Sequence, residues 1–98
     1  MRTLQVARAG DRVRTVAVAA GAATSVLRGV DADAWLTGEV SHHDALAAVA
    51  AGTSVLAAGH SNTERGYLRV LRRRLQRELG PGVAIAAAKR DRDPFTTV

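Results

Sequence analysis

The sequence predicts one α/β domain over residues 1–98, with a mainly parallel sheet covered by helices. Short apolar runs alternate along the chain with stretches whose apolar residues recur at helical spacing. The connections between most of these runs are long enough to hold a crossover helix, which parallel pairing requires. A chain of 98 residues has room for a single compact core, so we expect no second domain.

The first half of the chain alternates strand and helix patterns, with glycines at the boundaries. Strands are predicted at residues 4–7, 13–19 and 34–37, and a short helix at residues 22–28. Gly21 ends the second strand and Gly29 ends the helix.

The second half repeats the alternation with longer helices. Helices are predicted at residues 41–51 and 61–79, and strands at residues 53–58 and 83–88. The longer helix places four leucines on one stripe and arginines on the opposite side, which is the pattern of a helix with one buried face. A charged tail begins at Lys89.

The composition excludes several classes of protein. There is no cysteine, so a disulfide scaffold and a thiol nucleophile are excluded, and any metal site must use His, Asp and Glu. The apolar runs are far shorter than the ~20 residues that span a bilayer, and the N-terminus fits no secretory signal. We therefore expect no membrane association and a cytoplasmic location, with the nucleus as an alternative.

The net charge of +5 suggests nucleic-acid binding at first sight. Thirteen of the fourteen basic residues are arginine, however, and the chain is rich in alanine, as GC-rich coding produces. The arginine-rich helix also lacks the interleaved aromatic residues of a nucleic-acid surface, apart from Tyr67. The composition therefore argues against nucleic acid as a partner.

Polar residues collect in the loops that follow the predicted strands. In a parallel sheet these loops meet at one edge, which is where ligands bind. All three histidines lie in two of these loops, residues 37–44 and 59–64, which follow consecutive strands. This edge is therefore the candidate site.

The loop at residues 59–64 allows two interpretations. Ser61 and Glu64 have the spacing of a capping box, in which each side chain satisfies the other residue's backbone N–H. His60 and Glu64 are instead one helical turn apart, and an imidazole with a carboxylate suits Zn, Mn or Fe. On spacing alone, capping is the stronger interpretation.

The loop at residues 37–44 is similarly ambiguous. Ser41 and Asp44 form a second cap-like pair, and the adjacent His42 and His43 diverge by ~100° on a helix, so they do not chelate one ion together. We assign His43 to the crevice as a catalytic proton donor or substrate contact, with a surface histidine without a role as the alternative. Glu39 is an acid, a group that supports a metal ligand, or a solvated carboxylate, of which the last is favoured.

Three segments together resemble one known family. Residues 35–46 (WLTGEVSHHDAL), 59–68 (GHSNTERGYL) and 91–95 (DRDPF) look like the C-terminal part of the NGG-one-interacting-factor-three-like family, also called GTP cyclohydrolase 1 type 2. The resemblance covers residues 13–98, with the segments in the family's order.

The resemblance implies an α/β fold of two related halves, assembled into a toroidal hexamer, with two divalent metal ions in the cleft between the halves. Carried over by motif, it implies that His60 and Glu64 are metal ligands and that His43 lies near the site. The resemblance therefore favours Glu64 as a metal ligand over Glu64 as part of a capping box. The implied activity is that of a metal-dependent hydrolase acting on a nucleotide or a similar ring.

The sequence also departs from this family. The family's other ligands, a His-His-Pro pair and an Asp, come from an N-terminal half that nothing here matches. We therefore interpret the chain as a C-terminal half-domain that is inactive by itself and needs a complementary half or its own copies as partners. The alternative is a non-catalytic protein-interaction module or a truncated paralogue that self-associates.

Overall fold

The computed structural model describes residues 4–96 and 98. These residues form two compact units, residues 4–64 and the part from residue 65 onward, and each is described by itself. The single domain over residues 1–98 stays a prediction. In the described part of the chain, no helix is long and apolar enough to cross a membrane.

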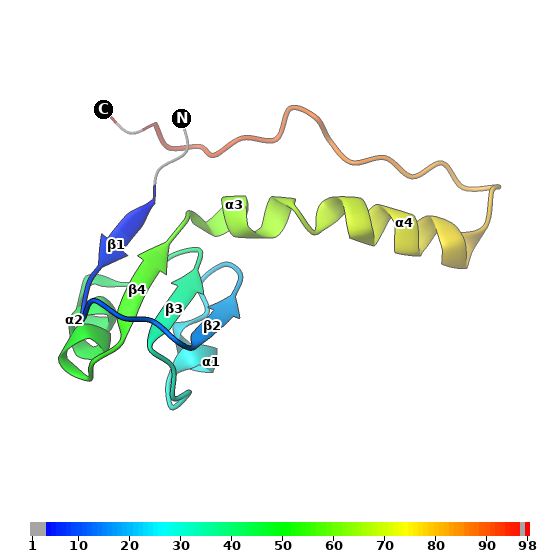
Figure 1. The fold of residues 1–98 in the computed structure, drawn as a ribbon. Helices are drawn as coiled ribbons and strands as arrows, with labels where there is room; N and C mark the ends of the chain where they lie inside the picture. The colour runs from blue at the N-terminus through cyan, green and yellow to red at the C-terminus, as the bar shows by residue number, and fades with distance from the viewer. Residues whose placement is uncertain (1–3, 97) are drawn as a thin grey trace. The chain divides into compact units, whose positions relative to one another are not determined.

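The first unit is built on one four-stranded sheet. Its strands are β1 (Gln5–Ala7), β2 (Val16–Ala19), β3 (Ala34–Thr37) and β4 (Ser54–Ala57), in the spatial order β1-β4-β3-β2 (Figure 1). Strands β2, β3 and β4 are parallel, whereas β1 pairs antiparallel with β4. The predicted α/β class and the mainly parallel sheet are confirmed.

Two helices connect the parallel strands. Helix α1 (Thr24–Leu27) lies between β2 and β3, and α2 (His42–Ala50) lies between β3 and β4. The core joins both helices to one face of the sheet, because Leu27 of α1 and Ala48 of α2 cluster with Trp35 and Val55 of the strands. The predicted elements of this unit are thus present, but most are a few residues shorter than expected, as element ends are the least certain part of a pattern.

The opposite face of the sheet carries an exposed apolar row. The strand register aligns Val18 with Leu36 and Leu56 and then with Val6 across all four strands. Because side chains alternate between faces along a strand, this row points away from the core residue Trp35. Val18 is 70% exposed and Val6 is 57% exposed, whereas Leu36 and Leu56 between them are partly buried, so the row is open to solvent mainly at its two ends.

The long helix predicted at residues 61–79 is interrupted in the structure. It forms α3 (His60–Arg65) and α4 (Leu68–Leu79), with a turn at Gly66 and Tyr67. Glycine is a poor helix former because its backbone loses more freedom on ordering than that of other residues, which explains where the interruption falls.

The strand predicted at residues 83–88 is wrong. Within the second unit, these residues follow the turn after α4 without strand structure, and Ile85 lies with Leu68 and Arg72 around a shared hollow. A strand needs a neighbour that supplies backbone hydrogen bonds. This apolar run lies along α4 instead, and a helix has no free backbone groups on its side to pair with it.

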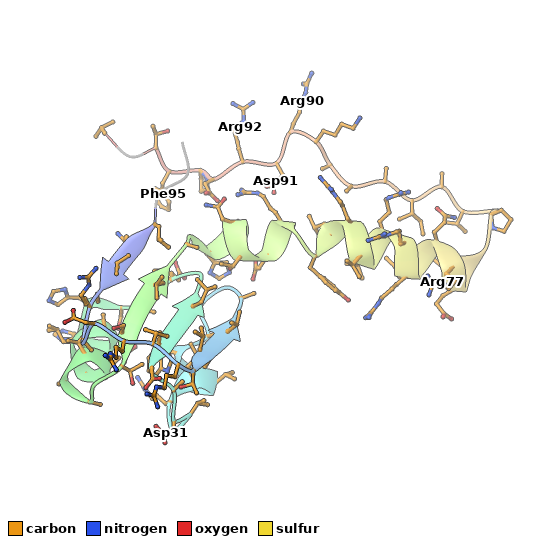
Figure 2. All side chains as sticks on the ribbon, viewed as in Figure 1. Asp31, Arg77, Arg90, Asp91, Arg92 and Phe95 are labelled. Carbon is orange, nitrogen blue, oxygen red and sulfur yellow. The ribbon has the colours of Figure 1, made fainter. Side chains whose placement is uncertain are left out.

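Ion pairs connect Arg65 to the charged tail within the second unit. Arg65 Nε lies 2.8 Å from Asp91 Oδ2, and Arg65 Nη2 lies 3.1 Å from Asp93 Oδ1. Figure 2 shows Asp91 on the opposite side of the tail from Arg90 and Arg92. The alternation of charge in the tail therefore separates the carboxylates that pair with Arg65 from the arginines on the other side of the tail.

Candidate functional site

The carboxyl ends of β2 and β3 are joined at one backbone oxygen. The carbonyl oxygen of Gly21 accepts hydrogen bonds from the N–H groups of Gly38 and Glu39, both at 3.0 Å. The hydroxyl of the fully buried Thr37 donates to the same oxygen at 3.3 Å. The two loops are thereby fixed to each other where ligands of parallel sheets bind.

The loop after β4 closes over the same point. The Gly21 N–H donates to Thr63 Oγ1 at 2.9 Å, and the Gly59 N–H donates to the Gly38 carbonyl at 2.8 Å. A Cβ atom on Gly38 would lie only 2.6 Å from the Gly21 oxygen and 2.8 Å from His60 Cα. Such an approach is possible only without a side chain at residue 38.

The side chains of His60 and Glu64 lie directly over Gly21. This glycine has a φ of +72°, and a Cβ there would lie 2.7 Å from Glu64 Oε1 and 3.2 Å from His60 Nε2. The glycine thus leaves open the space into which both side chains extend, and a larger residue at this position would fill it.

The His60 ring lies between two carboxylates. Its Nδ1 is 3.0 Å from Glu39 Oε1, and its Nε2 is 3.2 Å from Glu64 Oε1. The hydrogen bond with Glu39, followed by the charge of Glu64, raises the pKa of His60 above its usual value. The three side chains are 44%, 59% and 52% exposed for His60, Glu39 and Glu64, so solvent weakens these charge interactions.

The donor atoms of His60 and Glu64 meet some of the requirements of a divalent metal site, but not the number of ligands. Metal–ligand bonds to imidazole nitrogen and carboxylate oxygen are about 2.0–2.2 Å long, so donor atoms 3.2 Å apart can reach the same ion. Among the described residues, however, no group of three or more His, Asp and Glu side chains converges on one point. Two ligands are fewer than the three or four protein ligands of a typical zinc site.

The predicted capping box at Ser61 and Glu64 is wrong. Helix α3 begins at His60, so Ser61 lies inside the helix and is not its cap. The Thr63 N–H donates to the Gly59 carbonyl, and the Thr63 hydroxyl donates to the His60 carbonyl. Glu64 instead extends toward His60, which is the arrangement that the metal interpretation requires.

The second predicted cap is confirmed at the start of α2. Ser41 is the N-cap, and its Oγ accepts from the Asp44 N–H at 3.2 Å. Asp44 also pairs with Arg28 Nη2 at 2.6 Å, and the hydrogen bonds from Arg28 and Ser41 hold the pKa of Asp44 below its usual value. Asp44 therefore has a structural role, in the cap of α2 and in the ion pair with Arg28.

His43 is exposed in the first turn of α2. Its ring lies edge-on to the ring of His42, with centroids 6.0 Å apart. The contacts found in the described residues join His43 to neighbours on its own helix and do not join it to His60 or Glu64. Its catalytic role stays a prediction.

Sequence reasoning missed the contact between Glu39 and His60. These residues are 21 positions apart, and only the pairing of β3 with β4 brings their loops together. The one available signal was the position of Glu39 directly after Gly38 at a strand end, which is equally typical of a solvated carboxylate.

Comparison with known proteins gives a consistent family match. The sequence model described as Duf34/NIF3 (NGG1p interacting factor 3) matches residues 1–94. A bovine protein named NIF3-like protein 1 is 49% identical over 86 residues, covering 88% of this chain and 23% of the relative. The yeast NGG1-interacting factor 3 of Saccharomyces cerevisiae is 38% identical over 87 residues, covering 87% of this chain and 30% of the relative.

Solved structures show the same fold. A protein from Thermus thermophilus is 34% identical with a TM-score of 0.67, covering 76% of this chain and 31% of that protein. A Bacillus cereus protein related to NIF3 is 27% identical with a TM-score of 0.69, covering 98% of this chain and 28% of that protein. The chain thus spans about a quarter to a third of the length of these relatives.

Proposed function

Because the chain belongs to the Duf34/NIF3 family, we propose that it is the C-terminal part of a metal-dependent, hydrolase-like protein. In this proposal His60 and Glu64 supply two ligands to a dinuclear site of Zn, Mn or Fe. The observation that carries it is the convergence of His60 Nε2 and Glu64 Oε1, 3.2 Å apart over the open space at Gly21. Imidazole and carboxylate are the donor types that these ions take in proteins.

In the proposed activity, the metal ions and the residues of the chain have different roles. A bound pair of ions supplies an activated water and a polarised electrophile. His60 and Glu64 hold one side of the pair, and the loops joined at Gly21 keep both ligands in place. His43 is the proposed proton donor or substrate contact, and the proposed substrate is a nucleotide or a similar ring.

In this proposal the remaining ligands come from outside the part of the chain that the structure describes. Two ions need to be held from both sides, and among the described residues no group of three or more His, Asp and Glu side chains is placed to hold them. The proposed partners are therefore a complementary N-terminal half or further copies of the chain. We propose a cytoplasmic location and expect the chain alone to bind metal weakly and to be inactive.

Metal titration of the chain tests this proposal. Isothermal calorimetry with Zn²⁺ or Mn²⁺ compares wild type with His60→Ala and Glu64→Gln, and His42→Ala serves as a control because it removes an exposed histidine elsewhere. Both site variants are expected to lose binding, while the control keeps it. Unchanged affinity in His60→Ala would show that the ligand assignment is wrong.

The exposed sheet face favours a second candidate, a non-catalytic module that self-associates. The apolar row of Val6, Leu56, Leu36 and Val18 crosses the whole sheet, and contiguous apolar surface of this kind is typical of association sites. Size-exclusion chromatography with light scattering tests it. Val18→Lys is expected to lower the measured mass toward that of a monomer, whereas a wild-type chain that is already a stable monomer contradicts the candidate.

A further inference from the structure

Within residues 4–96, Glu39 is the carboxylate that reaches His60 from a different loop. It follows β3, whereas His60 and Glu64 follow β4. Its backbone N–H donates to the Gly21 carbonyl at 3.0 Å, and its Oε1 lies 3.0 Å from His60 Nδ1. The backbone bond fixes the start of the side chain, so the approach of Glu39 to His60 is built into the junction of the two loops.

The two carboxylates contact opposite nitrogens of the ring. Glu64 faces Nε2 and Glu39 faces Nδ1. A neutral imidazole carries one proton, and only the nitrogen without it has a lone pair for a metal. A carboxylate that accepts a bond from Nδ1–H therefore leaves the lone pair on Nε2, the nitrogen beside Glu64.

We propose that Glu39 is a positioning residue, which holds His60 in the tautomer with the proton on Nδ1 and aims Nε2 at the metal shared with Glu64. This inference rests on the proposed metal-binding function. Metal-binding histidines commonly donate their other N–H to a carboxylate, which fixes the ring and raises its basicity. Glu39 acts through His60 in this arrangement and does not itself bind the ion.

Nuclear magnetic resonance of the full chain, labelled with ¹⁵N, tests the orientation without any metal. At about pH 9, where histidine is neutral, the imidazole nitrogen shifts report which nitrogen carries the proton. Wild type is expected to hold the proton of His60 on Nδ1. Glu39→Ala is expected to move it toward Nε2, and Glu39→Gln, whose amide oxygen still accepts from Nδ1–H, is expected to restore the wild-type form.

A Zn²⁺ titration of the same samples tests the consequence. Glu39→Ala is expected to lower the Zn²⁺ affinity about 10–100-fold. The loss should lie toward the smaller value because the site is half exposed. Glu39→Gln is expected to keep a Zn²⁺ affinity close to that of wild type. Glu78→Ala removes an exposed glutamate from α4 and serves as the matched control. Its Zn²⁺ affinity and its His60 tautomer are expected to be unchanged.

Two outcomes would overturn the inference. If Glu39→Ala leaves the tautomer of His60 unchanged, Glu39 does not orient the ring. If Glu39→Gln loses as much Zn²⁺ affinity as Glu39→Ala, Glu39 binds the metal directly. If wild type binds no Zn²⁺, the proposed function fails, and the tautomer of the metal-free chain alone decides whether Glu39 orients His60.

Discussion

The two edges of the parallel sheet differ in how far polar side chains take part in joining the strands. At the carboxyl edge the loops are joined largely through the backbone, with the Gly21 carbonyl accepting from Gly38 and Glu39 and the Gly38 carbonyl accepting from Gly59. At the amino edge, side-chain bonds add to backbone bonds, in which the Asp33 and Ala34 N–H groups donate to the Thr15 carbonyl and the Ser54 N–H donates to the Asp33 carbonyl. Asp33 Oδ2 accepts from the N–H groups of Arg14 and Thr15 at 2.7 and 3.0 Å.

At the amino edge, polar side chains form hydrogen bonds that hold neighbouring segments together. The Asp33 N–H donates to Thr15 Oγ1 at 2.9 Å, and the Thr53 hydroxyl donates to the Ala32 carbonyl at 3.1 Å. At the carboxyl edge, glycine allows the backbones to approach closely enough to bond each other directly. His60, Glu64 and Glu39 are thereby left for one another and for a ligand, although all three lie at strand ends like Asp33.

The largest expected effect is that of a side chain at Gly38. In Gly38→Ala the new Cβ would lie 2.6 Å from the Gly21 oxygen and 2.8 Å from His60 Cα, so the backbones must move apart. We expect a loss of about 1–3 kcal/mol in the free energy of unfolding, measured with urea, together with weaker Zn²⁺ binding. Gly10→Ala is the control, since its Cβ meets nothing within 4 Å. Equal stability of the two variants would contradict the close approach.

Alanine substitutions at Gly21 and Gly29 distinguish the effect of backbone strain from the effect of blocking the site. Their φ values are +72° and +80°, so alanine at either position costs about 1–2 kcal/mol. Only at Gly21 would the new Cβ meet Glu64 and His60, whereas at Gly29 it meets nothing within 4 Å. Gly21→Ala is expected to lose Zn²⁺ binding and Gly29→Ala to keep it, as measured by calorimetry. Equal retention of binding would show that the metal lies elsewhere.

A change at the amino edge should affect stability alone. Thr53→Val removes the hydroxyl that donates to the Ala32 carbonyl, so we expect a loss of about 0.5–1.5 kcal/mol in urea denaturation. The Zn²⁺ affinity of this variant is expected to equal that of wild type. A drop in affinity comparable to that of Gly21→Ala would mean that the two edges are not independent.

The smallest expected effect is at Asp33 and depends on pH. The N–H groups of Arg14 and Thr15 hold the pKa of Asp33 below its usual 3.8. Because the folded state keeps this carboxylate charged to lower pH than the unfolded state does, its contribution is present above the usual pKa and is lost as pH falls through the folded pKa. Asp33→Asn is expected to be less stable than wild type at about pH 6, with the difference shrinking toward about pH 3. Melting temperatures across this range measure it, and a constant difference would contradict the assignment.

Local sequence patterns predicted much of the first unit. The cap at Ser41 was correct because capping depends on residues that the pattern itself contains, and the strand at residues 34–37 was correct because it has β2 and β4 as pairing neighbours. The strand at residues 83–88 was wrong because α4 lies beside this run in place of a pairing strand. An apolar run looks the same whether it pairs with a strand or packs beside a helix, and only the neighbour decides between them.

The sequence by itself determined the α/β alternation, the glycines at the strand ends and the restriction of any metal site to His, Asp and Glu. It also placed His60 and Glu64 one helical turn apart, since helical spacing is a local property. Only the tertiary structure decided that Glu39 meets Nδ1 and Glu64 meets Nε2 of the same ring. That choice depends on the register of β3 against β4 and on the approach of two glycine backbones, which residue order does not encode locally.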